Sequence, residues 1–428
     1  MPADIVGMGR NALSSPRFSS ALSTLAIGVA VFASVLHRVI GWAGLIAMLV
    51  TLVLLAVLSV LERRREIQWA GLLPLSLLLF VGWAGLSVLW SEYRSATADG
   101  FAYLLAFTIL GIAIALSRDT IQLVRAFGDV FRVALVVSLT IEVIAGLLID
   151  SPIRFLSVAG DLDVLGPIQG IMGSRNQLGL LALLAIVTFG IELRTRSVSR
   201  QLAIGSLVLG GLALALSRSP VTGAVFVVVV LATGSLYLLR RLTPVRRRFW
   251  QLALVAAALV AAVVAWAARS QIITLFSANS ELSYRLSLWQ QLWALIPQNP
   301  LQGWGWIGYW RSDRQPFFAF SVIGDRESTS AVNAYLDVWF QLGLVGIFLF
   351  GVLVVLAFVR SWLLAGRQRS VVFTWPALVL LTLIVTSLAE SSMLVEYGWM
   401  LLVVCTVKAA QELSWRSAFG TTEADPTE

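Results

Sequence analysis

The chain has little charge and almost none of the residues that build metal sites. Charged residues make up 13% of the 428 positions, with one cysteine, Cys405, and one histidine, His37. A single cysteine excludes an intrachain disulfide framework and a thiolate metal site, and a single histidine excludes a multi-histidine metal centre. The glycine-rich segment 303–308 neither follows a strand nor opens a Walker-type helix, so it does not predict a nucleotide site. We therefore expect no metal and no cofactor.

Apolar residues are abundant and fall in long uninterrupted runs. They make up 58% of the chain, whereas a soluble globular protein is about half apolar and about a quarter charged. Residues 40–61 and 371–389 carry no charge at all, and about 20 such residues cross the hydrocarbon of a bilayer. Within lipid the backbone must satisfy its own hydrogen bonds, so these runs should be helices. The sequence predicts an all-α, polytopic membrane protein.

Charged interruptions divide the chain into about twelve candidate transmembrane helices. The apolar run 21–36 follows Arg10 and Arg17 as in a signal peptide, but it lacks a cleavage site, so we interpret it as the first membrane helix. The predicted spans are 19–37, 40–61, 69–90, 100–116, 127–148, 176–193, 201–217, 219–239, 250–268, 333–358, 371–389 and 393–410.

The basic residues alternate between the two sides of these spans. With the N-terminus inside, twenty of the 31 lysines and arginines fall on the cytoplasmic side and ten on the other, as the positive-inside rule requires. Both termini are therefore predicted to be cytoplasmic. We attribute the net charge of +8 to topology and to anionic lipid headgroups, and we expect no nucleic-acid partner.

The predicted spans divide the chain into four parts. These are an N-terminal transmembrane bundle (1–268), a large extracytoplasmic loop (269–332), C-terminal transmembrane helices (333–410) and a cytoplasmic tail (411–428). A long loop with structural signals of its own indicates function. In this loop an apolar stripe with steps of four and three residues predicts an amphipathic helix along the membrane interface. The stripe consists of Leu282, Leu286, Trp289, Trp293 and Ile296.

Three arginines lie at the outer mouths of the predicted spans. Arg175 precedes the sixth span, Arg218 occupies a tight turn between the seventh and eighth, and Arg285 lies in the amphipathic helix. Each alone is typical of an interfacial arginine that extends from a helix end. Together they add positive charge on the side where it is normally depleted, and each guanidinium group can bind two oxygens of a phosphate at once. They predict a binding site for a diphosphate at the outer leaflet.

Several short segments follow one another in a set order along the chain. They are Leu86–Trp90, Ser174–Gly179, Leu216-Ser217-Arg218, Tyr284-Arg285 with Trp289, Asn299-Pro300, Gly303-Trp304-Gly305, Val332–Leu336, Gly343 with Gly346, and Glu390-Ser391-Ser392. In combination these segments resemble the O-antigen ligase and polysaccharide polymerase superfamily.

This resemblance implies a membrane glycosyltransferase of the bacterial cytoplasmic (inner) membrane. Its donor would be a polyprenyl-diphosphate-linked glycan, and its acceptor would be a saccharide, a lipid or a protein. Membrane lipid is a further expected partner. The residues expected to bind substrate are Arg175, Asn176, Arg218, Arg285, Asn333, Tyr335 and Glu390.

One position departs from the family pattern. Val332 stands where the ligases carry a histidine that is thought to activate the acceptor, and His37 is interpreted as a helix-boundary residue. A carboxylate is the expected substitute, because a general base needs position first and a suitable pKa second. The candidates are Glu327, Asp325 and Asp337.

Two other functions stay open at this point. A secondary transporter with twelve spans would show inverted halves and broken helices near the bilayer midplane, and no matching pair of interruptions is evident. An inactive or scaffolding member of the same family is the other alternative, because of Val332. The sugar, the linkage, the choice between polymerase and ligase, and the oligomeric state do not follow from the sequence.

Overall fold

The computed structural model describes residue 13 and residues 15–63, 74–162, 166–267, 271, 279–320 and 328–412. Within these residues every regular secondary-structure element is a helix, and the only β feature is one isolated bridge between Ile153 and Val158. The all-α prediction is confirmed. The α-helices are α2 (Pro16–Glu62), α3 (Leu75–Leu86), α4 (Arg94–Ser117), α5 (Thr120–Val143), α6 (Arg175–Thr195), α7 (Arg200–Ser217), α8 (Pro220–Leu239), α9 (Pro244–Ala267), α11 (Asn279–Leu295), α12 (Ala334–Arg367), α13 (Thr374–Thr386) and α14 (Glu396–Glu412).

Shorter helical turns join these elements. A π-helical turn, η2 (Ile144–Ile149), extends α5. The remaining turns are 3-10 helices: η1 (Ser87–Leu89), η3 (Arg154–Leu156), η4 (Gly170–Met172), η5 (Ile296–Gln298), η6 (Phe317–Phe320), η7 (Val371–Phe373) and η8 (Ser392–Leu394).

Seven helices of the described chain are long and apolar enough to cross a membrane, and two further apolar helices are shorter. The protein is therefore a multi-pass membrane protein. Helical segments lie in each of the twelve predicted stretches, as far as the structure describes these stretches, but the count of twelve crossings stays a prediction. The same is true of which end of the bundle faces the cytoplasm.

The longest helix, α2, is folded back on itself. Gly41 adopts φ 70° and ψ 176°, a backbone conformation that L side chains rarely occupy. The Ser59 hydroxyl donates a hydrogen bond to the carbonyl of Leu13 at 3.0 Å, although these residues lie on opposite sides of the turn. The two arms of α2 are therefore antiparallel neighbours, as the first two predicted spans require.

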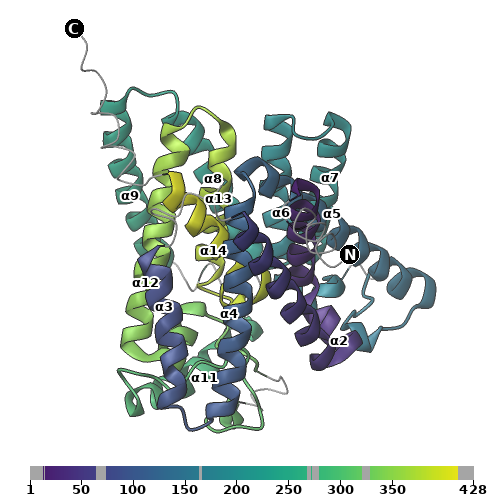
Figure 1. Ribbon diagram of the computed structural model, residues 1–428, viewed down its shortest axis with the longest axis vertical. Helices are drawn as coiled ribbons and strands as arrows, with labels where there is room; N and C mark the ends of the chain where they lie inside the picture. The colour runs from purple at the N-terminus through teal and green to yellow at the C-terminus, as the bar shows by residue number, and fades with distance from the viewer. Residues whose placement is uncertain are drawn as a thin grey trace, which may run out of the picture.

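Figure 1 shows how the helices are arranged. Helix α4 packs against both α2 and α14, α6 packs against α5 and α7, and α12 packs against α3 and α13. α14 is buried almost from end to end, which is typical of a helix that is apolar on all sides. The segments around α11 gather at one end of the bundle, the lower end in Figure 1.

Helix α12 is broken at Gly343, where φ is 67° and ψ is −166°. The break frees backbone groups that pair with the loop after η5. Trp304 and Gly305 donate their N–H groups to the carbonyls of Phe340 and Gln341 at 3.2 and 2.8 Å. In return, Leu344 and Val345 donate to the carbonyls of Pro300 and Leu301 at 2.9 and 3.2 Å. The glycine-rich loop and the helix break are therefore one structural unit.

The Leu86–Trp90 segment holds the same loop from the other side. The Ser87 hydroxyl accepts a hydrogen bond from the Trp306 N–H at 3.0 Å, and the Trp90 indole donates to the Gln302 carbonyl at 3.1 Å. These contacts bring together three of the segments on which the family resemblance rests.

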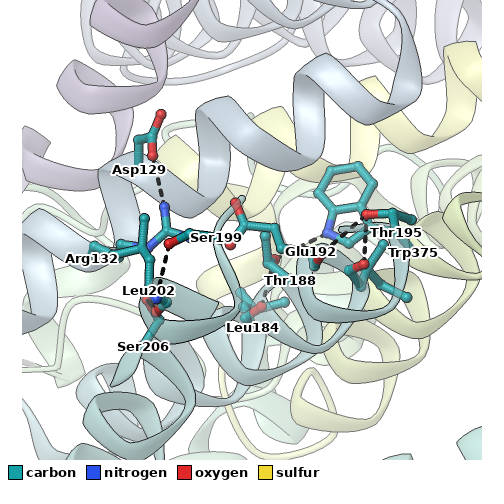
Figure 2. Close-up of polar contacts among 11 residues, drawn as sticks. Asp129, Arg132, Leu184, Thr188, Glu192, Thr195, Ser199, Leu202, Ser206 and Trp375 are labelled. Carbon is teal, nitrogen blue, oxygen red and sulfur yellow. Dashed lines mark hydrogen bonds and ion pairs between the residues drawn. The ribbon is translucent and has the colours of Figure 1, made fainter. Parts of the chain in front are cut away.

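A polar cluster ties α5 to α6 and α7 (Figure 2). Arg132 forms an ion pair with Glu192, which is fully buried, and its guanidinium also reaches Asp129 and the Ser206 hydroxyl, each at 2.7 Å. Its guanidinium lies 4.9 Å from the centre of the Phe189 ring. Paired and hydrogen-bonded, these charges can be buried without the large cost of an isolated ion.

The predicted helix in the large loop is present as α11. Its fully buried residues are Leu288 and Leu292, which the expected stripe did not include, whereas Leu286 and Trp293 of that stripe are about half exposed. α11 therefore has two apolar faces, and the spacing alone did not show which one packs against the protein. The exposed face suits contact with lipid, which stays a prediction.

Candidate functional site

A cavity of about 490 Å³ opens where five parts of the chain meet. It lies between the α2 turn, α4, the start of α6, the segment from α11 to α12, and the connection from α13 to α14. Polar and aromatic side chains dominate its wall, including those of Ser34, His37, Arg38, Trp42, Tyr103, Ser174, Gln177, Tyr284, Tyr309, Thr329, Ser330, Asp337, Glu390, Ser391, Ser392, Glu396 and Tyr397. A polar hollow among apolar helices is the default candidate for a binding site.

Glu390 is the centre of a network in this wall. Its carboxylate accepts hydrogen bonds from the Asn176 amide at 2.7 Å and from the Arg285 guanidinium at 3.0 Å. Asn176 in turn accepts a hydrogen bond from the Ser219 hydroxyl at 2.7 Å. The network joins α6, the α7–α8 turn, α11 and the α13–α14 connection, so three predicted substrate-binding residues are in direct contact.

Arg285 is buried, with 8% of its surface exposed. Besides Glu390, it donates to the backbone carbonyls of Ala389 and Val332, the latter at 3.2 Å. A guanidinium has five donors in a fixed plane, which allows it to hold two loops and a carboxylate at once.

Asn333 and Tyr335 attach the start of α12 to the end of α13. The Asn333 side chain accepts from the N–H groups of Tyr335 and Leu336 as the helix cap, and it donates to the Leu388 carbonyl at 3.1 Å. The Tyr335 hydroxyl donates to the Ile384 carbonyl at 3.0 Å. Neither side chain lines the cavity, so their contacts favour positioning of the wall.

Asp337 lines the cavity and is 1% exposed. Its carboxylate accepts from the Trp310 indole at 2.9 Å, the Gln341 amide at 2.7 Å and the Ala331 N–H at 3.2 Å. With donors on both oxygens, Asp337 fixes the loop before α12. The other two carboxylates predicted as bases, Asp325 and Glu327, lie outside the described residues.

The remaining predicted arginines lie beside the cavity, outside its lining. Arg175 is the first residue of α6, directly after the Ser174 cap, and is half-buried. Arg218 is exposed in the α7–α8 turn with φ 45°. The predicted tight turn is confirmed, because α7 ends at Ser217 and α8 begins at Pro220.

The comparison with protein families matches residues 203–351 to a model described as O-antigen ligase. This match supports membership of the chain in the O-antigen ligase family. A comparison with curated proteins found no match. The matched segment runs from α7 into α12 and supplies one wall of the cavity, from Tyr284 to Asp337.

The position that departs from the O-antigen ligase pattern lies in this wall. Val332 lines the cavity and has φ 50°. A β-branched residue rarely adopts this left-handed conformation, whereas histidine does so more readily. The strained backbone persists in this chain although the side chain is apolar.

Among the cavity residues that the site prediction did not include are two from the α2 turn, His37 and Arg38. His37 was interpreted as a helix-boundary residue, and Arg38 entered only the charge count. Arg38 donates to the Leu156 carbonyl at 2.8 Å, and its guanidinium packs against Gly173 just before α6. Both residues lie at a predicted outer span end, as Arg175 does, so the criterion that selected the arginines could have found them.

Glu396 also faces the cavity, at the first turn of α14. It accepts a hydrogen bond from the Tyr103 hydroxyl at 3.1 Å, and Tyr309 lines the cavity beside it. Burial, together with the neighbouring carboxylate, raises the pKa of Tyr309. Tyr309 therefore keeps its proton beside Glu396.

Proposed function

We propose that this chain transfers a glycan from a polyprenyl-diphosphate carrier to an acceptor hydroxyl in the described cavity. The match to the O-antigen ligase family implies a lipid-linked glycan donor and an acceptor. The observation that carries the proposal is the cavity itself. There the family-matched segment contributes Tyr309 and Asp337, and the rest of the chain contributes Arg38 and Glu390.

The diphosphate is proposed to bind near the start of α6. Arg38 packs on Gly173 there, and the N-terminus of a 21-residue helix adds backbone N–H donors and the positive end of its dipole. Arg175 in the first turn, Arg218 in the adjacent α7–α8 turn and Arg285 behind Glu390 would supply further positive charge. Positive charge at this point stabilises the departing diphosphate, the role that electrostatic groups have in many transfer reactions.

Glu390, Ser391 and the Tyr103–Glu396 pair are proposed to bind sugar hydroxyls, because a carboxylate and a hydroxyl offer acceptors and donors together. Val332 at the histidine position favours polymerisation or an atypical ligation. We propose that the reaction takes place at the extracytoplasmic face of the bacterial inner membrane, because the loop that we predict to be extracytoplasmic contributes Tyr284, Tyr309 and Ser330 to the cavity wall.

The test is deletion of the gene followed by analysis of lipid-linked glycans. We expect short diphosphate-linked glycans to accumulate and long polymer or ligated product to disappear. The wild-type gene and the control Arg241→Ala, an exposed arginine at the far end of α8, should restore the product. Arg38→Ala, Arg218→Ala and Arg285→Ala should not.

Unchanged glycans in the deletion strain would overturn the proposal, as would full complementation by all three site variants. Accumulation of the glycan on the cytoplasmic leaflet alone would instead support the transporter.

A further inference from the structure

His37 is the one imidazole of the protein, and it faces the cavity from the first arm of α2, four residues before the turn at Gly41. Its ring lies against Trp42, with the ring centres 4.2 Å apart. Within the part of the chain that the structure describes, neither ring nitrogen has a hydrogen-bond partner. The imidazole is therefore held in place by an aromatic contact, and its nitrogens are available to a ligand.

The carboxylates of the same wall are already engaged. Asp337 accepts from three groups of the protein, Glu390 accepts from Arg285 and Asn176, and Glu396 accepts from Tyr103. Each of these carboxylates has lone pairs occupied by donors of the protein, whereas the ring of His37 is held by the contact with Trp42 alone within the described residues. Among the titratable groups that line the cavity, His37 is the one best placed to accept a proton.

We propose that His37 is the general base of the transfer reaction, an inference that rests on the proposed glycosyl transfer. A ring nitrogen takes the proton of the acceptor hydroxyl while its oxygen forms a bond to the anomeric carbon of the donor sugar. The bond from that carbon to the diphosphate oxygen breaks, and the polyprenyl diphosphate leaves with the electron pair. The imidazolium then returns its proton to water or to the departing diphosphate. Imidazole is the group most often used for this task.

Val332 offers a second position in the cavity from which an imidazole could act. Val332 lines the same cavity as His37, and its φ of 50° suits histidine better than valine. A histidine at 332 should therefore present a second imidazole to the same space without distorting the backbone.

The experiment uses purified full-length protein in detergent or liposomes, with the lipid-linked glycan extracted from the deletion strain as the probe. His37→Ala is expected to lower kcat by roughly 10²- to 10⁴-fold, the usual contribution of a general base. Added imidazole, which can enter the space left by the side chain, should restore at least about tenfold of the lost rate. Val39→Ala is the matched control on the same arm, because Val39 is 60% exposed and does not line the cavity.

Two further variants separate a chemical role from a structural one. His37→Gln keeps a polar side chain of similar size, so it should retain the melting temperature yet lose kcat. Adding Val332→His to His37→Gln should recover part of the activity.

Wild-type activity in His37→Gln and His37→Ala would overturn the inference and leave the proposed function intact. So would a loss that neither imidazole nor Val332→His relieves. Absence of transfer by the wild-type protein, with unchanged glycans in the deletion strain, would instead overturn the proposed function.

Discussion

Substituting Gly343 by alanine should destabilise the protein through the contact between broken helix and loop. A Cβ atom added at this glycine would lie 2.2 Å from the carbonyl oxygen of Leu301 and 2.6 Å from the N–H of Gln302. Both are backbone atoms, so no rotation of a side chain can relieve the clash. The φ of 67° adds a second cost, since L residues lose about 1–2 kcal/mol in the left-handed region.

Relief requires the loop to move away from the break, which weakens four backbone hydrogen bonds. These are the bonds from Trp304 and Gly305 to α12 and from Leu344 and Val345 to the loop. Each contributes about 0.5–1.5 kcal/mol net. With the conformational strain, complete loss of the contact would cost roughly 3–8 kcal/mol.

The assay is thermal unfolding of the detergent-solubilised protein, followed by tryptophan emission. Gly351→Ala is the matched control in the same helix, because a Cβ there meets nothing within 4 Å and its backbone is helical. Alanine in a helix is favoured over glycine by about 0.5–1 kcal/mol, so this variant should melt at the wild-type temperature or above it. Equal melting temperatures for the two variants would refute the reasoning, because the clash would then be absent in solution.

Two further predictions concern carboxylates that accept hydrogen bonds from other parts of the protein. In a double-mutant cycle, Arg285→Met and Glu390→Gln should show a coupling of about 1–3 kcal/mol in unfolding free energy, and additive losses would contradict the 3.0 Å ion pair. Glu142→Leu should lower the melting temperature and slow glycan transfer, since Glu142 is buried and accepts from the N–H groups of Gln169 and Gly170 at 2.9 and 2.7 Å just before α6. Glu142→Gln, which keeps an acceptor, should lose less on both measurements, and equal losses would argue against this role.

The positions of the helices were predictable because the signal is local. Apolar runs of about 20 residues specify a membrane helix whatever their neighbours, and charged residues mark their ends. The turn between α7 and α8 followed from Arg218 and Pro220 in the same way. The break in α12 was harder to predict from the sequence, because a single glycine such as Gly343 predicts only a weaker helix. The sharp turn depends on hydrogen bonds to the distant loop after η5.

The contacts of the site were not predictable in the same way. Asn176, Arg285 and Glu390 were each selected as single residues, but their mutual hydrogen bonds depend on how three separate elements rotate and pack. Apolar periodicity does not determine that rotation, as the buried Leu288 and Leu292 of α11 demonstrate. The pairing also changes the chemistry of Arg285, because its guanidinium already forms an ion pair with the Glu390 carboxylate before any phosphate binds.

The candidate base, His37, shows that separation along the sequence is a poor guide to which residues share a cavity built from several helices. His37 was set aside because it lies far from Val332 along the chain and beside a helix end. The turn at Gly41 places that helix end at the cavity, so the boundary position that argued against His37 is what brings it into the cavity wall. A base supplied from α2 also frees position 332 from carrying an imidazole, and the positive φ of Val332 then persists because Arg285 holds its carbonyl. A catalytic residue that is missing from one wall of a cavity therefore does not show that activity is lost, because a residue of another wall can take its place.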